Sequence, residues 1–165
     1  EKKGFMLQHS FLRGIRQLKD FNLTYDILIY PHQLEEAIVL VEKNPDQPFV
    51  LDHLAKPYIK DQKIDKWASL IKQLAKHKNV YCKLSGMITE ADWNHWLARD
   101  FDNYLSVALE AFGSNRLMFG SDWPVCLLAG SYQHVVQIID LYINKLKASD
   151  QKKIMGENAC NFYNL

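Results

Sequence analysis

The sequence predicts an α/β protein with a parallel β-sheet. Short apolar segments typical of strands alternate along the chain with longer segments whose apolar residues recur at helical spacing. This alternation indicates βαβ units, in which the strands run parallel. The pattern fits either a doubly wound sheet or half of a (β/α)8 barrel, because a whole barrel takes about 250 residues and the chain has 165. A Gly-x-Gly-x-x-Gly pattern and a P-loop lysine are both missing from the sequence, which argues against nucleotide binding.

The first part of the chain contains a predicted strand between two predicted helices. Over 9–21 the apolar residues keep helical spacing, and Ser10 is the expected N-cap. The segment 25–30, Tyr-Asp-Ile-Leu-Ile-Tyr, has strand character and ends before a proline. Helical spacing returns over 33–43 and ends in the turn Asn44-Pro45-Asp46.

The remaining elements repeat this order of strand and helix. Apolar runs predict further strands over 49–51, 80–84 and 116–120. Helical periodicity predicts helices over 64–76, 93–112 with an irregular break near Arg99-Asp100, 133–147 and 150–162. We expect Trp67, Trp93 and Trp96, which lie in these helices, to pack them against the sheet.

The composition is typical of one globular domain, which we expect to cover residues 1–165. The net charge of +1 gives no sign of a nucleic-acid or anionic-membrane partner. No apolar run approaches the roughly 20 residues of a membrane span. Cys82, Cys126 and Cys160 are an odd number without Cys-x-x-Cys spacing. This favours inert, partly buried thiols, a reducing compartment and a cytoplasmic location.

Residues capable of chemistry lie at or just beyond the carboxyl end of every predicted strand. In parallel α/β folds this edge of the sheet carries the active site. Imidazole, carboxylate, ammonium and hydroxyl groups together can bind a metal ion, move a proton or stabilise an oxyanion. In chain order these residues are His32, Asp52, His53, Lys83, Ser85, Asp122 and Trp123.

Each of these residues also has a structural alternative. His32 can cap the helix that follows it, and His53 can belong to an ordinary loop. Lys83 can point outward between helices, and Asp122 can be the N-cap of a turn. Trp123 can flank a bound ring or pack in the core. Coincidence at every strand end is the weaker explanation, which favours a shared site.

Five segments together resemble the amidohydrolase-2 branch of the amidohydrolase superfamily. Within this branch they are most similar to predicted metal-dependent hydrolases that include sugar lactonases, and more distantly to pyrone-dicarboxylate lactonase. The resemblance runs from Phe11 to Leu165 and depends on order and spacing rather than on any one segment. The segments are YDILIYPHQL (25–34), FVLDHLAKP (49–57), NVYCKLSGM (79–87), RLMFGSDWPV (116–125) and GENACNFYNL (156–165).

The resemblance implies a TIM-like, distorted (β/α)8 barrel, of which this chain would carry strands five to eight. The family's His-x-His pair on strand one has no counterpart in this sequence. We therefore expect a fragment of a longer barrel, because barrel strands without their neighbours leave unpaired sheet edges that favour aggregation.

The resemblance also implies a hydrolase that opens small sugar-acid lactones, of the L-fuconolactone or L-rhamnonolactone type, in carbohydrate metabolism. By position, Asp122 resembles the family's strand-eight aspartate and His53 its strand-six histidine, and we expect both to be catalytic. Asp122 would take a proton from water and return it to the departing oxygen, while His53 or Lys83 stabilises the oxyanion. Lys83, Trp123 and His32 are the expected substrate-binding residues.

Two versions of this mechanism stay open, with and without a metal ion. In the metal-assisted version His32, His53 and Asp122 are ligands of one divalent ion, zinc or manganese, which lowers the pKa of its bound water. In the metal-free version the same side chains act directly. The expected partner is a small-molecule lactone. The alternative functions are a decarboxylase or hydratase of the same branch and a non-catalytic half-barrel that binds a partner.

Overall fold

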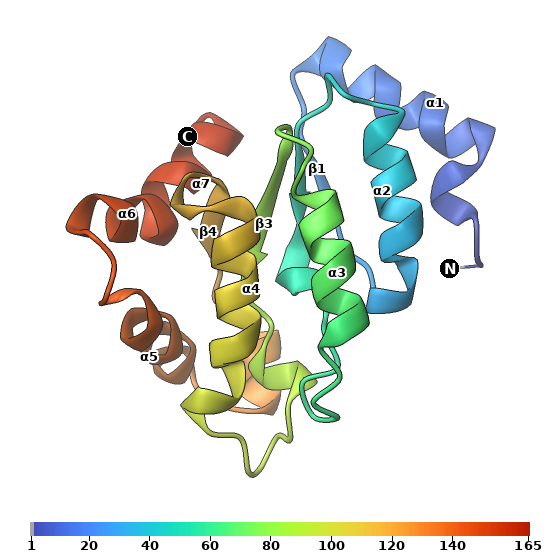
Figure 1. Cartoon of the computed structure of the whole chain (residues 1–165). Coiled ribbons are helices and arrows are strands. Elements are labelled where there is room, and N and C mark those ends of the chain that lie inside the picture. The colour runs from blue at the N-terminus through green and yellow to red at the C-terminus, as the bar shows by residue number, and fades with distance from the viewer. Residues whose placement is uncertain (1) are drawn as a thin grey trace.

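A computed structural model describes residues 2–165 as one parallel sheet with helices around it (Figure 1). The strands β1 (Tyr25–Ile27), β2 (Phe49–Leu51), β3 (Val80–Leu84) and β4 (Leu117–Phe119) lie side by side in sequence order. Ile27 is in register with Leu51, and Leu51 with Cys82. The carboxyl ends of the strands therefore meet at one edge of the sheet, as the sequence predicts.

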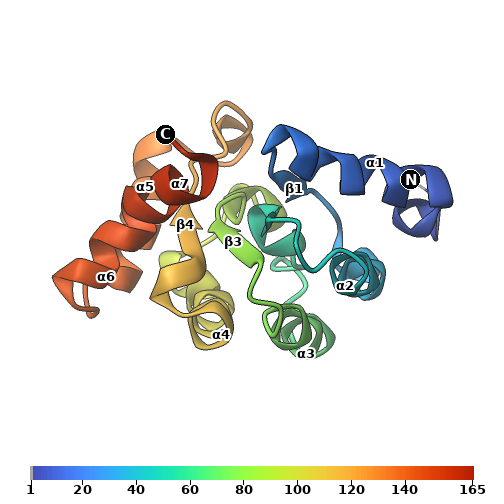
Figure 2. The same cartoon turned by 90° about the horizontal axis from the view of Figure 1, so that it is seen from above.

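Three helices cover one face of the sheet. Seen from above, α2 (Leu34–Glu42), α3 (Asp65–Leu74) and α4 (Asp102–Phe112) follow the strands in an arc (Figure 2). On β3, the side chains of Val80, Cys82 and Leu84 are buried in the core that these helices share. Because successive side chains on a strand point to opposite faces, Tyr81 and Lys83 point away from α2–α4. We call this opposite face the inner face.

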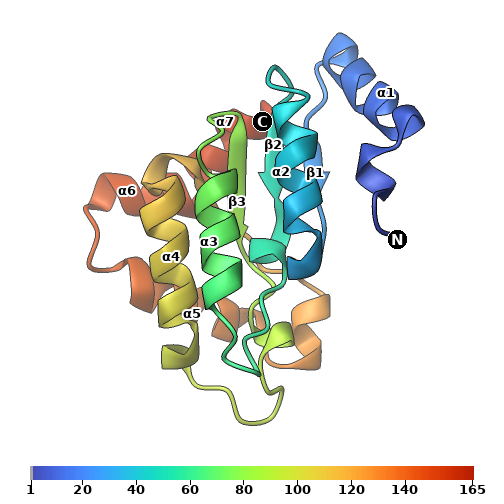
Figure 3. The same cartoon turned by 45° about the vertical axis from the view of Figure 1, so that its right-hand side comes forward.

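The C-terminal helix α7 (Asn158–Tyr163) covers part of the inner face. There Phe162 joins a small apolar cluster with Val50 and Met118, and its ring packs on Tyr81 with 4.9 Å between the ring centroids. The flanking helices are α1 (His9–Leu18) beyond β1, and α5 (Tyr132–Ile143) and α6 (Ala148–Lys152) beyond β4 (Figures 1 and 3). A π-helical turn, Lys153–Glu157, joins α6 to α7. Among residues 2–165, no helix has the length and apolar character needed to cross a membrane.

The structure confirms a strand at each of the four predicted positions, although the first ends at Ile27 and not at residue 30. The helix expected over 150–162 is divided by the π-helical turn, and the helix expected over 93–112 begins only at Asp102. The preceding residues form turns because the carboxylates of Asp92 and Asp100 accept hydrogen bonds from nearby backbone N–H groups. Such local bonds compete with helix formation. Trp93 is consequently 48% exposed and does not pack the helices on the sheet.

The N-cap expected at Ser10 is also wrong. The Leu12 N–H already donates to Gln8 O, so α1 begins before Ser10, which lies inside the first turn. Trp67 behaves as expected, since it is buried on α3 and packs on Tyr104. Trp96 is half-buried and packs on Phe101, but it lies outside any helix, contrary to the expectation.

The three cysteines are free thiols in different surroundings. Cys82 and Cys126 are buried, whereas Cys160 is exposed on α7, contrary to the expectation of burial. Burial raises the pKa of the Cys82 thiol, which keeps it protonated and unreactive.

Candidate active site

The turn after β2 holds His53 in an unusual backbone conformation. His53, Leu54, Ala55 and Lys56 all have positive φ angles, between 50° and 58°. For residues other than glycine this left-handed conformation costs about 1–2 kcal/mol each, so surrounding contacts must maintain it. Strain of this kind is concentrated at functional sites.

Contacts from two other segments hold this left-handed turn. Trp67 Nε1, on α3, donates to Leu54 O at 2.7 Å. Lys56 Nζ forms an ion pair of 2.8 Å with Glu90 Oε1, in the segment after β3. Within the turn, the Lys56 N–H donates to His53 O at 2.7 Å. The position of His53 is therefore set by contacts on both sides of its own turn.

Asp122 follows β4 and is also left-handed, with φ of 55°. Two small residues precede it. Ser121 Oγ accepts a hydrogen bond from the Trp123 N–H, and a Cβ on Gly120 would lie 3.0 Å from the Cβ of Ser85. The Asp122 side chain is 10% exposed, and its Oδ2 is buried without a hydrogen-bond partner among residues 2–165. One carboxylate oxygen is thus left for a ligand or a water molecule.

The imidazole of His53 links Asp122 to the end of β3. His53 Nε2 lies 3.7 Å from Asp122 Oδ1, and His53 Nδ1 is hydrogen-bonded to Ser85 Oγ at 2.8 Å. Burial lowers the pKa of His53, although the carboxylates of Asp122 and Asp52 oppose this. The ring is therefore neutral at neutral pH, and its bond to Ser85 orients Nε2 toward Asp122. The sequence locates Ser85 at a strand end, but no local pattern predicts this bond.

The Lys83 side chain points to the inner face of the sheet. The sequence alone leaves open whether it points there or outward between the helices. Its ammonium contacts Asp26 Oδ2 at 2.5 Å and Asp52 Oδ1 at 2.8 Å. Burial by itself lowers the pKa of Lys83, but its hydrogen bond to Asp26 and its ion pair with Asp52 outweigh burial, so the pKa is raised. Lys83 is thus a permanent cation and is unable to act as a general base.

Asp26 and Tyr163 belong to the same network, and neither was predicted from the sequence as a site residue. The Tyr163 hydroxyl donates to the Asp26 carboxylate, with distances of 3.0 Å to Oδ1 and 2.8 Å to Oδ2. The sequence does mark Asp26 as unusual, because it is the one charged residue in the apolar segment 25–30. No such signal marked Tyr163.

His32 and Trp123 lie apart from this buried group. His32 is exposed in the 3-10 turn Pro31–Gln33, where its ring stacks on Tyr30 with 6.1 Å between centroids. It also lines a cavity of about 520 Å³ together with Tyr58 and Trp67; neither His53 nor Asp122 lines this cavity. Trp123 is 64% exposed directly beside Asp122.

The ligand set expected for a metal ion is only partly assembled. Within residues 2–165, no group of three or more His, Cys, Asp or Glu side chains is arranged to hold an ion. His53 and Asp122 face each other and, with the free Asp122 Oδ2, fit two ligand positions. His32 does not join them, because its ring stacks on Tyr30 at the surface. A catalytic zinc site usually has three protein ligands, and the described residues bring two of them together.

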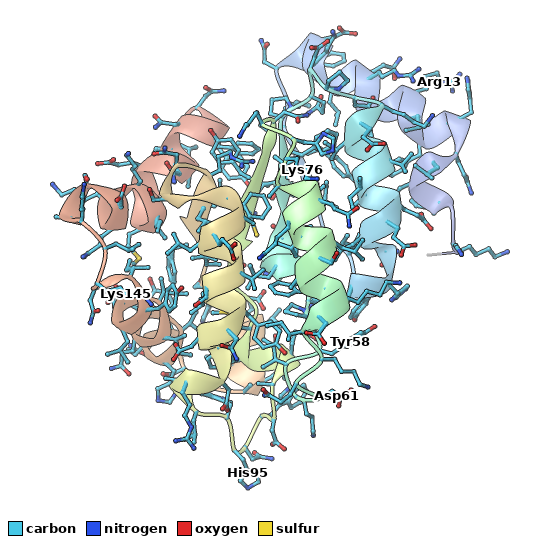
Figure 4. The ribbon with its side chains drawn as sticks, in the orientation of Figure 1. Arg13, Tyr58, Asp61, Lys76, His95 and Lys145 are labelled. Atoms are coloured by element: carbon cyan, nitrogen blue, oxygen red, sulfur yellow. The ribbon has the colours of Figure 1, made fainter. Side chains whose placement is uncertain are left out.

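The loops around the site lie at one end of the molecule. Figure 4 shows Tyr58, Asp61 and His95 at the end where the strands finish, and Lys76 at the opposite end. This is the edge at which (β/α)8 barrels carry their active sites.

Comparison with known proteins agrees with this architecture. The family model described as amidohydrolase matches residues 5–165. The chain belongs to the amidohydrolase family. The resemblance noted from the five sequence segments is thereby confirmed.

Curated relatives of this amidohydrolase chain include lactonases. An L-fucono-1,5-lactonase from Burkholderia multivorans is 36% identical over 99% of this chain and 58% of its own length. An L-rhamnono-gamma-lactonase from Scheffersomyces stipitis is 25% identical over 81% of this chain and 45% of its own length. The chain thus spans about half the length of these relatives.

Solved structures confirm the fold of this amidohydrolase chain. A crystal structure of an amidohydrolase from Burkholderia multivorans with bound zinc has a TM-score of 0.94 at 36% identity, covering 98% of this chain and 60% of that protein. Amidohydrolase 2 from Bifidobacterium longum subsp. infantis has a TM-score of 0.76 at 21% identity, which supports the fold alone; it covers 99% of this chain and 58% of that protein. The four strands therefore correspond to the C-terminal half of a (β/α)8 barrel, and the doubly wound alternative is excluded.

Proposed function

We propose that this chain carries the proton-transfer residues of a hydrolase that opens small sugar-acid lactones, of the L-fuconolactone or L-rhamnonolactone type. The observation that carries the proposal is the Asp122 carboxylate, which has a buried, unpartnered oxygen and faces a neutral His53 across 3.7 Å. Relatives named as lactonases support the substrate class.

In the proposed reaction Asp122 is the general base and then the general acid. It accepts a proton from water as the water oxygen bonds to the lactone carbonyl carbon. When the ring C–O bond breaks, Asp122 returns this proton to the departing oxygen, and the product is the open hydroxy acid. Its partly buried position favours this exchange, because a buried carboxylate has few competing water contacts.

His53 stabilises the oxyanion that forms during the addition. This role needs a proton on Nε2, so the Ser85 hydroxyl must donate to Nδ1 of the imidazole. The 2.8 Å contact between Ser85 Oγ and Nδ1 fits this arrangement. With the Ser85 hydroxyl as the donor to Nδ1, Nε2 carries the proton that the oxyanion needs.

Substrate contacts are proposed for the residues around the pair. Trp123 is exposed next to Asp122 and offers an aromatic face to the sugar ring. His32 and Lys83 are the other residues for which we propose substrate contact, His32 from the exposed turn after β1. Cytoplasmic location and a role in carbohydrate metabolism also remain proposals, supported by the free thiols and the named relatives.

A divalent ion, zinc or manganese, is proposed as an optional cofactor. When bound, it supplies activation of a water molecule, and Asp122 and His53 are the described residues that would hold it. The amidohydrolase from Burkholderia multivorans that was crystallised with zinc supports this proposal.

A substrate screen tests the function. The purified protein is assayed by proton release on sugar lactones, and by absorbance on aromatic carboxylic acids, before and after chelation. We expect turnover of a sugar lactone and none of the aromatic acids. Turnover of aromatic acids alone would favour the decarboxylase or hydratase alternative, and binding without turnover would favour a non-catalytic half-barrel. Loss of turnover on chelation, restored by zinc or manganese, would identify the metal-assisted version.

A further inference from the structure

A chain of contacts on the inner face joins the C-terminal helix to the turn of His53. It begins at the Tyr163 hydroxyl, which donates to the Asp26 carboxylate on β1. Asp26 contacts the Lys83 ammonium on β3, and Lys83 contacts the Asp52 carboxylate. Asp52 is the residue directly before His53. Tyr163 and Asp26 are 137 residues apart in sequence, so this contact depends on the whole fold.

The groups in this chain of contacts are complementary and largely shielded from water. Two carboxylates share one ammonium, and the side chains of Lys83, Asp26 and Asp52 are only 22%, 35% and 14% exposed. The Asp26 carboxylate, which makes the shorter of the two contacts with Lys83, also accepts a hydrogen bond from the Tyr163 hydroxyl. Because partly buried charged groups have few water molecules to replace a lost partner, each member fixes the position of the next.

The geometry also explains how the turn of His53 is held at its first residue. The contacts described above hold the turn at Leu54 and Lys56. At its beginning, the ion pair between Asp52 and Lys83 is the corresponding contact. A left-handed turn of non-glycine residues needs such contacts throughout, since relaxation at one end would release the strain.

We infer that Tyr163 is a positioning residue of the active site: its hydroxyl holds Asp26, Asp26 holds Lys83, and Lys83 holds Asp52 at the start of the His53 turn. In addition to the substrate contact proposed above, Lys83 then acts on the site through its ion pair with Asp52. The kinetic consequence of this inference rests on the proposed function, whereas its structural consequence does not.

Removal of a single hydroxyl, Tyr163→Phe, tests the inference. The aromatic ring that packs on Phe162 is retained, so the fold and the apolar cluster are kept. Tyr81→Phe is the matched control, because Tyr81 packs on the same Phe162 ring but lies outside the chain of contacts. We expect Tyr163→Phe to lower kcat by about tenfold or more, in line with loss of one hydrogen bond to a charged group, with KM unchanged. Tyr81→Phe should leave both constants unchanged.

Hydrogen exchange provides a second readout that does not require activity. The Lys56 N–H donates to His53 O inside the turn, so its exchange rate reports opening of the turn. We expect this amide to exchange several-fold faster in Tyr163→Phe than in the wild type or in Tyr81→Phe. Equal exchange in the two variants would overturn the inference. If the wild type opens no lactone, the proposed function fails, but faster exchange in Tyr163→Phe would still support the positioning role.

Discussion

His53 and Asp122 face each other with 3.7 Å between Nε2 and Oδ1, and both residues have left-handed backbone at the carboxyl ends of their strands. β3 lies between the two strands that carry them, and it contributes Ser85 to the imidazole. Three strand ends therefore converge on one imidazole. Two strained residues that meet in this way indicate a functional constraint, because nothing in an ordinary loop would maintain both conformations.

Replacement of Asp122 by asparagine tests its role as general base and acid. Asp122→Asn keeps the shape of the side chain but is unable to accept the proton from water. We expect kcat on a sugar lactone to fall by about 10²- to 10⁴-fold, with the thermal midpoint and circular dichroism unchanged. Near-normal turnover in a folded variant would dismiss Asp122 from proton transfer.

Ser85 provides a separate test of how His53 is oriented. Ser85→Ala removes the hydrogen bond to Nδ1 and frees the tautomer of the imidazole. The loss of one buried hydrogen bond costs about 1 kcal/mol, so we expect kcat to fall roughly five- to tenfold. Steady-state kinetics of Ser85→Ala and Ser121→Ala make the comparison, because the Ser121 hydroxyl bonds the Trp123 N–H and not the imidazole. An equal effect of the two substitutions would contradict an orienting role for Ser85.

The sequence predicts much of this site because strands and their ends leave local patterns. Apolar runs mark each strand, and in a parallel sheet the residue that follows a strand must lie at the active edge. His53 and Asp122 were therefore located from the sequence, whereas Lys83 lies inside β3 and the sequence left its direction open. The length of the chain left barrel and doubly wound folds open, because both are made of the same local units.

Other features of the site have no local signature. The left-handed turn of His53 contains no glycine, so its φ angles depend on contacts with α3 and with the segment after β3. The contact between Asp26 and Tyr163 joins residues 137 positions apart. His32 was expected to be a metal ligand because it follows a strand, but its ring stacks on Tyr30 at the surface.

Gly86 shows how closely the backbone after β3 approaches His53. Its φ is 63°, and a Cβ there would lie 2.8 Å from three atoms of the His53 side chain. We expect Gly86→Ala to destabilise the protein by at least about 1–2 kcal/mol from the left-handed backbone, and to lower kcat because the imidazole must move. Chemical denaturation and kinetics measure the two effects.

Gly4→Ala is the matched control for Gly86→Ala. Gly4 also has a positive φ of 83°, but a Cβ there would meet nothing within 4 Å. The Gly4→Ala variant should therefore lose a similar free energy of unfolding to its left-handed backbone but keep its turnover. Loss of kcat in both variants, or in neither, would show that the close approach of Gly86 to His53 has no part in catalysis.

The hydroxyl of Tyr163 predicts a change of stability at alkaline pH. Burial raises the pKa of Tyr163 to about 12; Lys83 opposes this and the Asp26 carboxylate reinforces it. Since the pKa in the folded protein lies above the ordinary value of 10, the folded state favours the protonated phenol. This stabilisation is complete below pH 10 and is lost as the pH rises through 12.

We expect the thermal midpoint of the wild type to fall more steeply between pH 10 and pH 12 than that of Tyr163→Phe, which has no phenol to ionise. Differential scanning calorimetry across this range measures both slopes, and Tyr81→Phe controls for the loss of any one tyrosine. Parallel curves for wild type and Tyr163→Phe would mean that the Tyr163 phenol ionises as freely in the folded protein as in the unfolded chain.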